Sequence, residues 1–228
     1  MHYRIGTRGS KLALVQSEYV KRRMEEAYPE DTFELVIIKT TGDKVTDKPL
    51  AAIGTKGLFV REIEEELLSG SIDMAVHSMK DMPAECETGL TFAKAWKRED
   101  CRDVLILKTE GSFSELPSGA VIGTGSLRRA CQLAMLRPDI QFTAIRGNVD
   151  TRINKLMDDS YGLDGIVLAA AGLNRLGRSS EITEYLDPEV VIPAPAQGVL
   201  AIETVEVNTE LLDKINALSD DNSDREAV

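Results

Sequence analysis

Short apolar runs, each bounded by turn-forming residues, recur along the chain and predict β-strands at residues 33–38, 72–76, 104–107, 120–122, 142–145, 166–170 and 199–202. Between these runs, apolar residues recur at three- and four-residue spacing, which is typical of amphipathic helices. The helices are predicted at residues 11–27, 58–68, 127–136, 149–157 and 211–218. This alternation of strands and helices predicts an α/β fold whose sheets are covered by helices on both faces.

One local pattern occurs twice and predicts two lobes. Residues 5–10 read I-G-T-R-G-S and residues 122–126 read I-G-T-G-S, and each segment leads into a predicted helix. Both are interpreted as a strand, a G-T turn, a serine and a helix. Ser10 or Ser126 would cap its helix, and the free N–H groups of the first turn would favour an anion. Ordinary helix capping explains the same pattern.

The predicted lobes are joined by two crossings of the chain. The charged stretch 97–102, K-R-E-D-C-R, lies between the two repeated patterns and is the first candidate. Prolines stiffen a linker and do not extend a helix, so the P-A-P segment at 193–195 is the second. The predicted domains are therefore residues 1–96 with 197–220, and residues 97–196.

The segment D-M-A-V-H-S-M-K-D-M-P at residues 73–83 is the strongest candidate for chemistry. Ser78, Lys80 and Asp81 follow a predicted buried strand, and ligands bind beyond the carboxyl ends of strands in open α/β sheets. Beside Lys80, Asp81 could be an ionised carboxylate that bonds or exchanges protons with an N–H group or a cation. A solvated turn is equally compatible with this segment. His77 is expected to face the core.

Composition excludes several classes of protein. The 228 residues are 43% hydrophobic and carry a formal charge of −11, so the whole molecule should repel nucleic acid and anionic membranes. The amino end resembles no signal peptide and no apolar run approaches the length of a membrane span, so a cytoplasmic monomer is expected. Three cysteines without a C-x-x-C pair and two isolated histidines predict neither disulfides nor a metal site.

A basic region runs from residue 126 to residue 152 of this acidic chain. Arginine suits carboxylates because its planar guanidinium donates two parallel hydrogen bonds. The pattern favours binding of a polycarboxylate or a phosphate over a solvated helix face for Arg128, Arg129, Arg146 and Arg152. Arg137, which precedes a proline, is assigned to a surface ion pair. A glycine-framed cation at 54–57, G-T-K-G, lacks the spacing of a P-loop, which disfavours nucleotide hydrolysis.

Six motifs in order along the chain closely resemble the porphobilinogen deaminase family, also called hydroxymethylbilane synthases. They are I-G-T-R-G-S-K-L-A-L-V-Q at 5–16, G-T-K-G-L-F-V at 54–60, V-H-S-M-K-D-M-P at 76–83, G-T-G-S-L-R-R at 123–129, R-G-N-V-D-T-R at 146–152 and P-A-P-A-Q-G at 193–198. The resemblance covers nearly the whole chain.

The resemblance implies tetrapyrrole biosynthesis: four porphobilinogen units are joined head to tail into hydroxymethylbilane, with release of ammonia. It implies mixed sheets flanked by helices in two lobes that resemble type II periplasmic binding proteins, with the active cleft between them. It also implies a dipyrromethane cofactor, held by a thioether to a cysteine of a third domain. Asp81 matches the catalytic carboxylate. The positions that match contacts to the acetate and propionate groups are Arg8, Ser10, Gln16, Lys56, Ser78, Lys80, Ser126, Arg128, Arg129, Arg146, Arg152 and Gln197.

The sequence departs from the family pattern in two places. Ala52 stands where some members carry a lysine, and the G-G-C motif that bears the cofactor is absent, so Cys86, Cys101 and Cys131 are not assigned to the thioether. Ser223 with Glu226 forms a capping box that announces a helix, which predicts that residues 221–228 begin a third domain and that the chain is an inactive fragment. The competing interpretations are a non-enzymatic two-lobed protein that binds a carboxylated small molecule, and a ligand-sensing effector domain.

Overall fold

The computed structural model describes residues 1–40, 60–83 and 85–227, and the chain divides into two compact units. Unit 1 comprises Met1–Arg98 and Val199–Val228, and unit 2 comprises Glu99–Gly198. Each unit is built on its own mixed sheet. Within the described ranges, no helix is long and apolar enough to cross a membrane.

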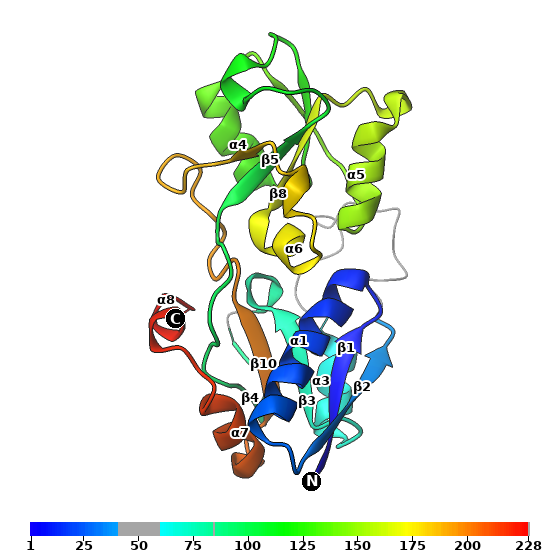
Figure 1. The fold of residues 1–228 in the computed structure, drawn as a ribbon, viewed down its shortest axis with the longest axis vertical. Helices are drawn as coiled ribbons and strands as arrows, with labels where there is room; N and C mark the ends of the chain where they lie inside the picture. Colours follow the sequence, from blue (N-terminus) through cyan, green and yellow to red (C-terminus); the bar gives the residue numbers. More distant parts are fainter. Residues whose placement is uncertain (41–59, 84, 228) are drawn as a thin grey trace. The chain divides into compact units, whose positions relative to one another are not determined.

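The sheet of unit 1 has the strand order β2-β1-β3-β10-β4 (Figure 1). Its strands are β1 (His2–Arg8), β2 (Thr32–Ile38), β3 (Met74–Ser78), β4 (Leu90–Phe92) and β10 (Leu200–Val205). β1 pairs in parallel with β2 and β3, whereas β10 is antiparallel to both β3 and β4. The carboxyl ends of β1 and β3 therefore lie at the same edge of the sheet.

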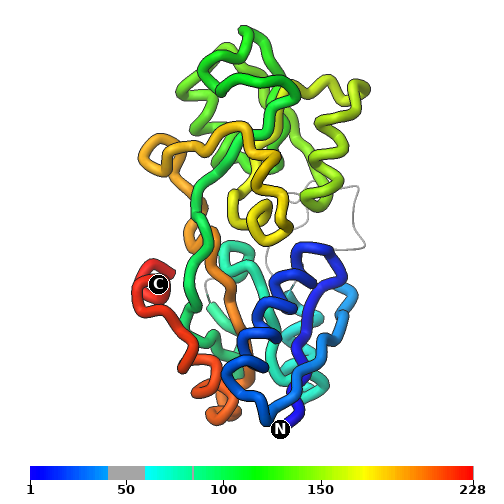
Figure 2. Tube along the Cα trace, in the orientation of Figure 1, coloured from blue at the N-terminus to red at the C-terminus, as the bar shows by residue number. Residues whose placement is uncertain are grey.

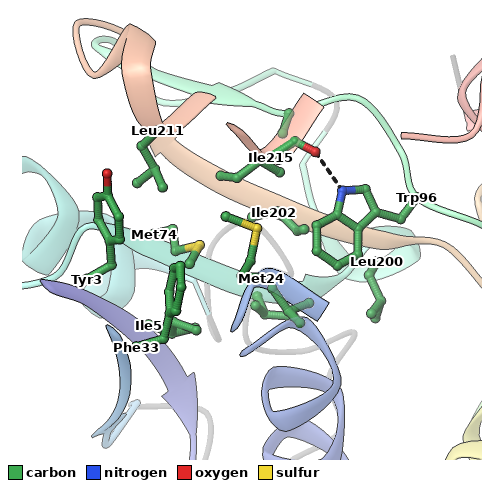
Figure 3. Packing of buried hydrophobic residues seen from close by; sticks show 13 residues of the cluster. Tyr3, Ile5, Met24, Phe33, Met74, Trp96, Leu200, Ile202, Leu211 and Ile215 are labelled. Carbon is green, nitrogen blue, oxygen red and sulfur yellow. Dashed lines mark hydrogen bonds between the residues drawn. The ribbon is translucent and has the colours of Figure 1, made fainter. Parts of the chain in front are cut away.

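Helices cover both faces of this sheet because side chains of a strand alternate between its faces. Met74 and Val76 of β3 pack with α1 (Lys11–Ala27) and α7 (Thr209–Asn216) in one core cluster. Figure 3 shows this cluster, in which the indole N–H of Trp96 donates a hydrogen bond of 2.9 Å to the carbonyl of Ile215. The intervening Ala75 packs on the other face, against Ile63 and Leu67 of α3 (Arg61–Leu68).

The sheet of unit 2 has the order β7-β6-β8-β5-β9. Its strands are β5 (Asp103–Leu107), β6 (Val121–Gly123), β7 (Gln141–Thr143), β8 (Gly165–Ala169) and β9 (Glu184–Tyr185). β6 is parallel to β7 and β8, and β5 is antiparallel to β8 and β9. The strands β1, β2 and β3 of unit 1 thus have the same arrangement as β6, β7 and β8 of unit 2, which explains the sequence pattern that occurs twice.

The helices of unit 2 are α4 (Leu127–Leu136), α5 (Val149–Met157) and α6 (Ala170–Arg175). Leu133 of α4 belongs to a core cluster that contains Leu105 and Val167, on one face of the sheet. Ile153 of α5 and Leu173 of α6 pack with Val104 and Ile166 in a second cluster, on the opposite face. Both faces are covered, as the alternation of strands and helices predicts.

The last helix, α8 (Asp221–Ala227), lies against the segment 95–98 of the same unit. The Asp224 Oδ1 atom accepts a hydrogen bond of 2.7 Å from the Ala95 N–H, and the Ser223 Oγ atom accepts one of 2.9 Å from the Arg98 N–H. Figure 2 shows this helix, in red, beside the green chain of that segment. Whether residues 221–228 begin a further domain stays a prediction.

Several predicted element boundaries are wrong, among them those of β7, β10 and α7. Three further differences have their reason in pairing and capping. β1 continues through the predicted turn at Gly6 and Thr7 because every residue from His2 to Arg8 pairs with β2. β3 ends two residues later than predicted, since Ser78 still pairs with Leu200 of β10. The helix predicted from its capping box is present, but the Asp220 side chain caps it by accepting a hydrogen bond of 2.8 Å from the Ser223 N–H.

Candidate functional site

Unit 1 contains a pocket of about 120 Å³ at the edge where β1 and β3 end. A pocket of this size can hold several water molecules or a small group such as a carboxylate. The lining combines positions that the sequence singled out with positions that it did not. The residues are Arg8, Ser10, Leu12, Ala13, Gln16, Val76, His77, Ser78 and Asp81.

The start of α1 forms one wall of this pocket. Ser10 adopts an extended backbone conformation and its Oγ atom accepts a hydrogen bond of 3.3 Å from the Ala13 N–H, so it caps the helix as predicted. One turn later, the amide nitrogen of Gln16 donates a hydrogen bond of 3.0 Å to Ser78 Oγ at the end of β3. The second contact ties α1 to the end of β3, and the positive end of the helix dipole favours an anion beside them.

Asp81 lies in the single turn of 3₁₀ helix, Met79–Asp81, that follows β3. The turn is held by the Met79 N–H, which donates to the carbonyl of Val199 at 3.0 Å, and by the Met82 N–H, which donates to Met79 at 3.0 Å. Lys80 and Asp81 are both exposed. Among the described residues, none forms a hydrogen bond or an ion pair with the Asp81 carboxylate. A carboxylate on a fixed turn is thus available to a ligand.

Two capped helices start at one edge of the sheet in unit 2. α4 follows β6 and α5 follows β7, and these two strands are parallel neighbours. Ser126 Oγ accepts a hydrogen bond from the Arg129 N–H at 3.5 Å, and Asn148 Oδ1 accepts one from the Thr151 N–H at 2.8 Å. Arg146 precedes the second cap and Arg152 follows it, with the Arg152 Nε atom donating to the Gly147 carbonyl at 2.8 Å. The predicted basic positions therefore share this edge.

Three predicted ligand-binding side chains of unit 2 meet at Asp103, the first residue of β5, which sequence reasoning missed. We call Asp103, Arg128, Arg129 and Gln197 the Asp103 cluster. Arg129 Nε and Nη2 donate to Asp103 Oδ1 at 2.9 and 2.7 Å, and the Gln197 amide nitrogen donates to the same oxygen at 2.8 Å. Arg128 Nη1 lies 2.7 Å from Asp103 Oδ2.

Burial and charge act against each other on Asp103, whose side chain is completely buried. Burial by itself raises the pKa of this carboxyl, but the positive charge of Arg129, the hydrogen bonds from Arg129 and Gln197 and the ion pair with Arg128 outweigh it and lower the pKa. Gln197 and Arg129 are themselves buried, at 1% and 6% exposure. A direct contact of either side chain with a ligand stays a prediction.

The remaining predicted positions fall into two groups. Lys56 and Ala52 lie outside the described residues. Arg137 forms the predicted surface pair, with its Nε and Nη2 atoms 2.7 and 2.6 Å from the two carboxylate oxygens of Asp139. The part of the chain that the structure describes contains no cluster of three or more His, Cys, Asp or Glu residues that could hold a metal ion.

The similarity to a known family extends over the strands of both units. A family model described as porphobilinogen deaminase, dipyromethane cofactor binding domain, matches residues 3–213. The chain belongs to the porphobilinogen deaminase family. A porphobilinogen deaminase of Lachnospira eligens is 97% identical over 100% of this chain and 77% of its own length. A porphobilinogen deaminase of Clostridioides difficile is 52% identical over 98% of the chain and 74% of its length.

Solved structures that resemble this porphobilinogen deaminase family member confirm its predicted fold class. The methionine binding protein MetQ matches with a TM-score of 0.58 at 14% identity, over 99% of this chain and 93% of that one. A probable amino-acid ABC transporter extracellular-binding protein of Bacillus subtilis matches with a TM-score of 0.58 at 13% identity, over 96% and 90%. At such identities the likeness shows the fold alone, that of type II periplasmic binding proteins, and does not support a non-enzymatic binding protein.

Proposed function

We propose that Asp81 is the catalytic carboxylate of this chain and that its substrate is porphobilinogen, on which the family acts in tetrapyrrole biosynthesis. The observation that carries the proposal is the exposed carboxylate of Asp81 on the rim of an anion-favouring pocket, where no described residue forms a hydrogen bond or an ion pair with it. Porphobilinogen combines a pyrrole N–H, a cationic aminomethyl group and two carboxylates. The Asp81 carboxylate matches the pyrrole N–H and the aminomethyl cation, and the hydrogen-bond donors of the pocket match the two carboxylates.

The chemistry assigned to Asp81 is electrostatic. Loss of ammonia breaks the bond between the aminomethyl carbon and nitrogen and leaves a positive charge spread over the pyrrole and its methylene carbon. A carboxylate held on a turn whose backbone is already bonded stabilises that charge without having to reorganise. It also accepts a hydrogen bond from the pyrrole N–H, which orients the ring.

The acidic side chains of substrate and cofactor are proposed to be held at the two sheet edges. The contacts are Arg8, Ser10, Gln16, Ser78 and Lys80 in unit 1, and Ser126, Arg128, Arg129, Arg146, Arg152 and Gln197 in unit 2. Helix N-termini and arginines fit a group that carries acetate and propionate side chains, as the dipyrromethane of this family does. When bound, that group supplies the pyrrole carbon to which substrate units are joined.

Calorimetric titration of this chain tests the role of Asp81 without requiring turnover. The ligands are porphobilinogen and an analogue in which methyl replaces the aminomethyl group. We expect the wild type to bind porphobilinogen more tightly than the analogue. Asp81→Asn should lower the ratio of the two Kd values about tenfold or more, because a hydrogen bond to a charged group contributes about 1.5–3 kcal/mol. Asp213→Asn, an exposed aspartate of α7, is the control and should change neither affinity. An unchanged preference in Asp81→Asn would refute the assignment.

A further inference from the structure

The Asp103 cluster contains a buried carboxylate to which the proposed function gives no role. Asp103 has 0% exposure at the start of β5. Its two carboxylate oxygens contact Arg128 and Arg129 of α4 and Gln197. A buried carboxylate is costly unless it is paired and hydrogen-bonded. The Oδ1 atom of Asp103 accepts hydrogen bonds from Arg129 and Gln197, whereas Oδ2 has an ion pair with Arg128 but no hydrogen-bond partner among the described residues. Its partners are residues that the family resemblance assigns to ligand binding.

Charge in the cluster is not balanced. Among the described residues, Asp103 is the one carboxylate within ion-pair distance of Arg128 or Arg129. Two guanidinium groups against one carboxylate leave one positive charge uncompensated. A single carboxylate from a ligand would neutralise it.

The two arginines differ in how they could meet that ligand. Arg129 donates from Nε and Nη2 to Asp103 and from Nη1 to the Val167 carbonyl at 3.2 Å, and only 7% of its side chain is exposed. Arg128 uses Nη1, which contacts Asp103 and donates to the Ile192 carbonyl at 2.5 Å, and 25% of its side chain is exposed. Its Nε and Nη2 atoms bond to no group of the described chain.

We propose that Asp103 is a positioning residue: it holds Arg129 as a fixed internal cation and orients Arg128 so that its Nε–Nη2 edge binds one carboxylate of the ligand. This edge is the planar fork that donates two parallel hydrogen bonds to a carboxylate. Because Nη1 is already held, less conformational freedom is lost when the ligand binds. The inference rests on the proposed function for the identity of the natural ligand, but the orientation of Arg128 can be tested without it.

The first test is the direction in which Asp103→Asn changes the affinity for porphobilinogen. Asp103→Asn removes a negative charge, so a purely electrostatic role for the cluster predicts tighter binding of an anion. The positioning role predicts weaker binding, and we expect the calorimetric Kd for porphobilinogen to rise about tenfold. Arg128→Lys keeps the charge but loses the fork and should have a similar effect. In the Arg128→Lys background, Asp103→Asn should add less than about threefold, because both act through one contact.

Arg137 and Asp139 provide the control in the same unit, since they form a carboxylate–guanidinium pair at the surface. Arg137→Lys and Asp139→Asn should leave the Kd unchanged. An equal or lower Kd in a folded Asp103→Asn variant, with far-ultraviolet circular dichroism as the check on folding, would overturn the proposal. So would full additivity of the two substitutions.

The second test is independent of porphobilinogen and of how Asp103→Asn folds. The arginine Nε–H signals of the wild type are followed by NMR during titration with sodium acetate, with sodium chloride as the ionic-strength control. We expect the Arg128 signal to shift and the Arg129 signal to remain in place and exchange slowly with solvent. A shift of Arg129 without one of Arg128, or of neither, would overturn the proposal. A shift of Arg128 in a chain that does not bind porphobilinogen would refute the proposed function alone.

Discussion

His77 Nε2 lies 3.2 Å from Glu203 Oε2, and the Glu203 side chain is completely buried. The two residues come from the neighbouring antiparallel strands β3 and β10, on the face of the sheet that α3 covers. Both carboxylate oxygens of Glu203 lack a hydrogen-bond partner in the described residues. Burial, together with the nearby charge of Glu203, raises the pKa of Glu64 on α3. His77 is also one of the residues that line the pocket.

We expect His77→Leu to lower the free energy of unfolding of unit 1 by about 3 kcal/mol, because it leaves a buried carboxylate without its partner. The double variant His77→Leu with Glu203→Met should recover most of that loss, since an apolar pair carries no desolvation cost. Urea unfolding followed by fluorescence measures this in unit 1, because Trp96 is the single tryptophan and lies in its core. Additive effects of the two substitutions would contradict the pairing.

Cys86 should be much less reactive than Cys131. Burial, with a contribution from Glu203, raises the pKa of the Cys86 thiol to about 11, whereas Cys131 is exposed. Since the thiolate is the reactive form, alkylation of Cys86 by iodoacetamide should be slow at pH 8 and rise steeply above pH 10. Stability linked to this thiol is present below its unfolded pKa near 9 and is lost as the pH rises through 11. Peptide mass spectrometry over a pH series gives both alkylation rates, and equal rates at pH 8 would contradict the assignment.

Incubation with porphobilinogen should leave the intact mass of this chain unchanged after denaturation. The sequence assigns the cofactor thioether to none of Cys86, Cys101 and Cys131, and the raised pKa of Cys86 disfavours its thiolate near neutral pH. Intact-mass spectrometry before and after incubation checks this, and the 97% identical relative, treated in the same way, is the comparison. A stable increase by two pyrrole units would show that one of these cysteines does bear the group.

A glycine is required at position 147 because of the backbone conformation there and because of the close approach to Thr151 of α5. Its φ is +116°, and a Cβ atom there would lie 2.6 Å from Thr151 Cγ2. Gly119 has a comparable φ of +84° but an added Cβ would meet nothing within 4 Å, so it is the matched control. We expect Gly119→Ala to cost about 1 kcal/mol and Gly147→Ala about 2–3 kcal/mol, because only the second adds a clash to the positive φ.

Hydrogen exchange of the peptide that contains α5 gives the local readout for these glycine variants. Gly147→Ala should accelerate exchange at the start of α5, where Asn148 caps the helix. Gly119→Ala should leave that peptide unchanged. Similar acceleration in both variants would mean that the contact with Thr151 does not matter.

The sequence by itself determined the long helices and most of the order of the elements, but the short helix α6 was not predicted. The bounds predicted for α1, α4 and α5 agree with the structure, because helix periodicity and the caps Ser10 and Ser126 are local features. The short edge strands β4 and β9 were missed, since three and two residues carry too little pattern to be recognised. The motifs also indicated which residues could bind an anion, and that assignment stays a prediction.

Only the tertiary structure decided which of those charged residues pair with one another. Asp103 stands 26 residues from Arg129 and 94 from Gln197, and no local pattern links an aspartate to partners at such separations. His77 and Glu203 likewise meet only because β10 returns to pair with β3. Helices and caps follow from neighbours in the chain, whereas burial of a charge depends on which distant group reaches it. The sequence therefore identified the charged residues. The fold decided which of them are buried in ion pairs, and which guanidinium edge, that of Arg128, is left for a ligand.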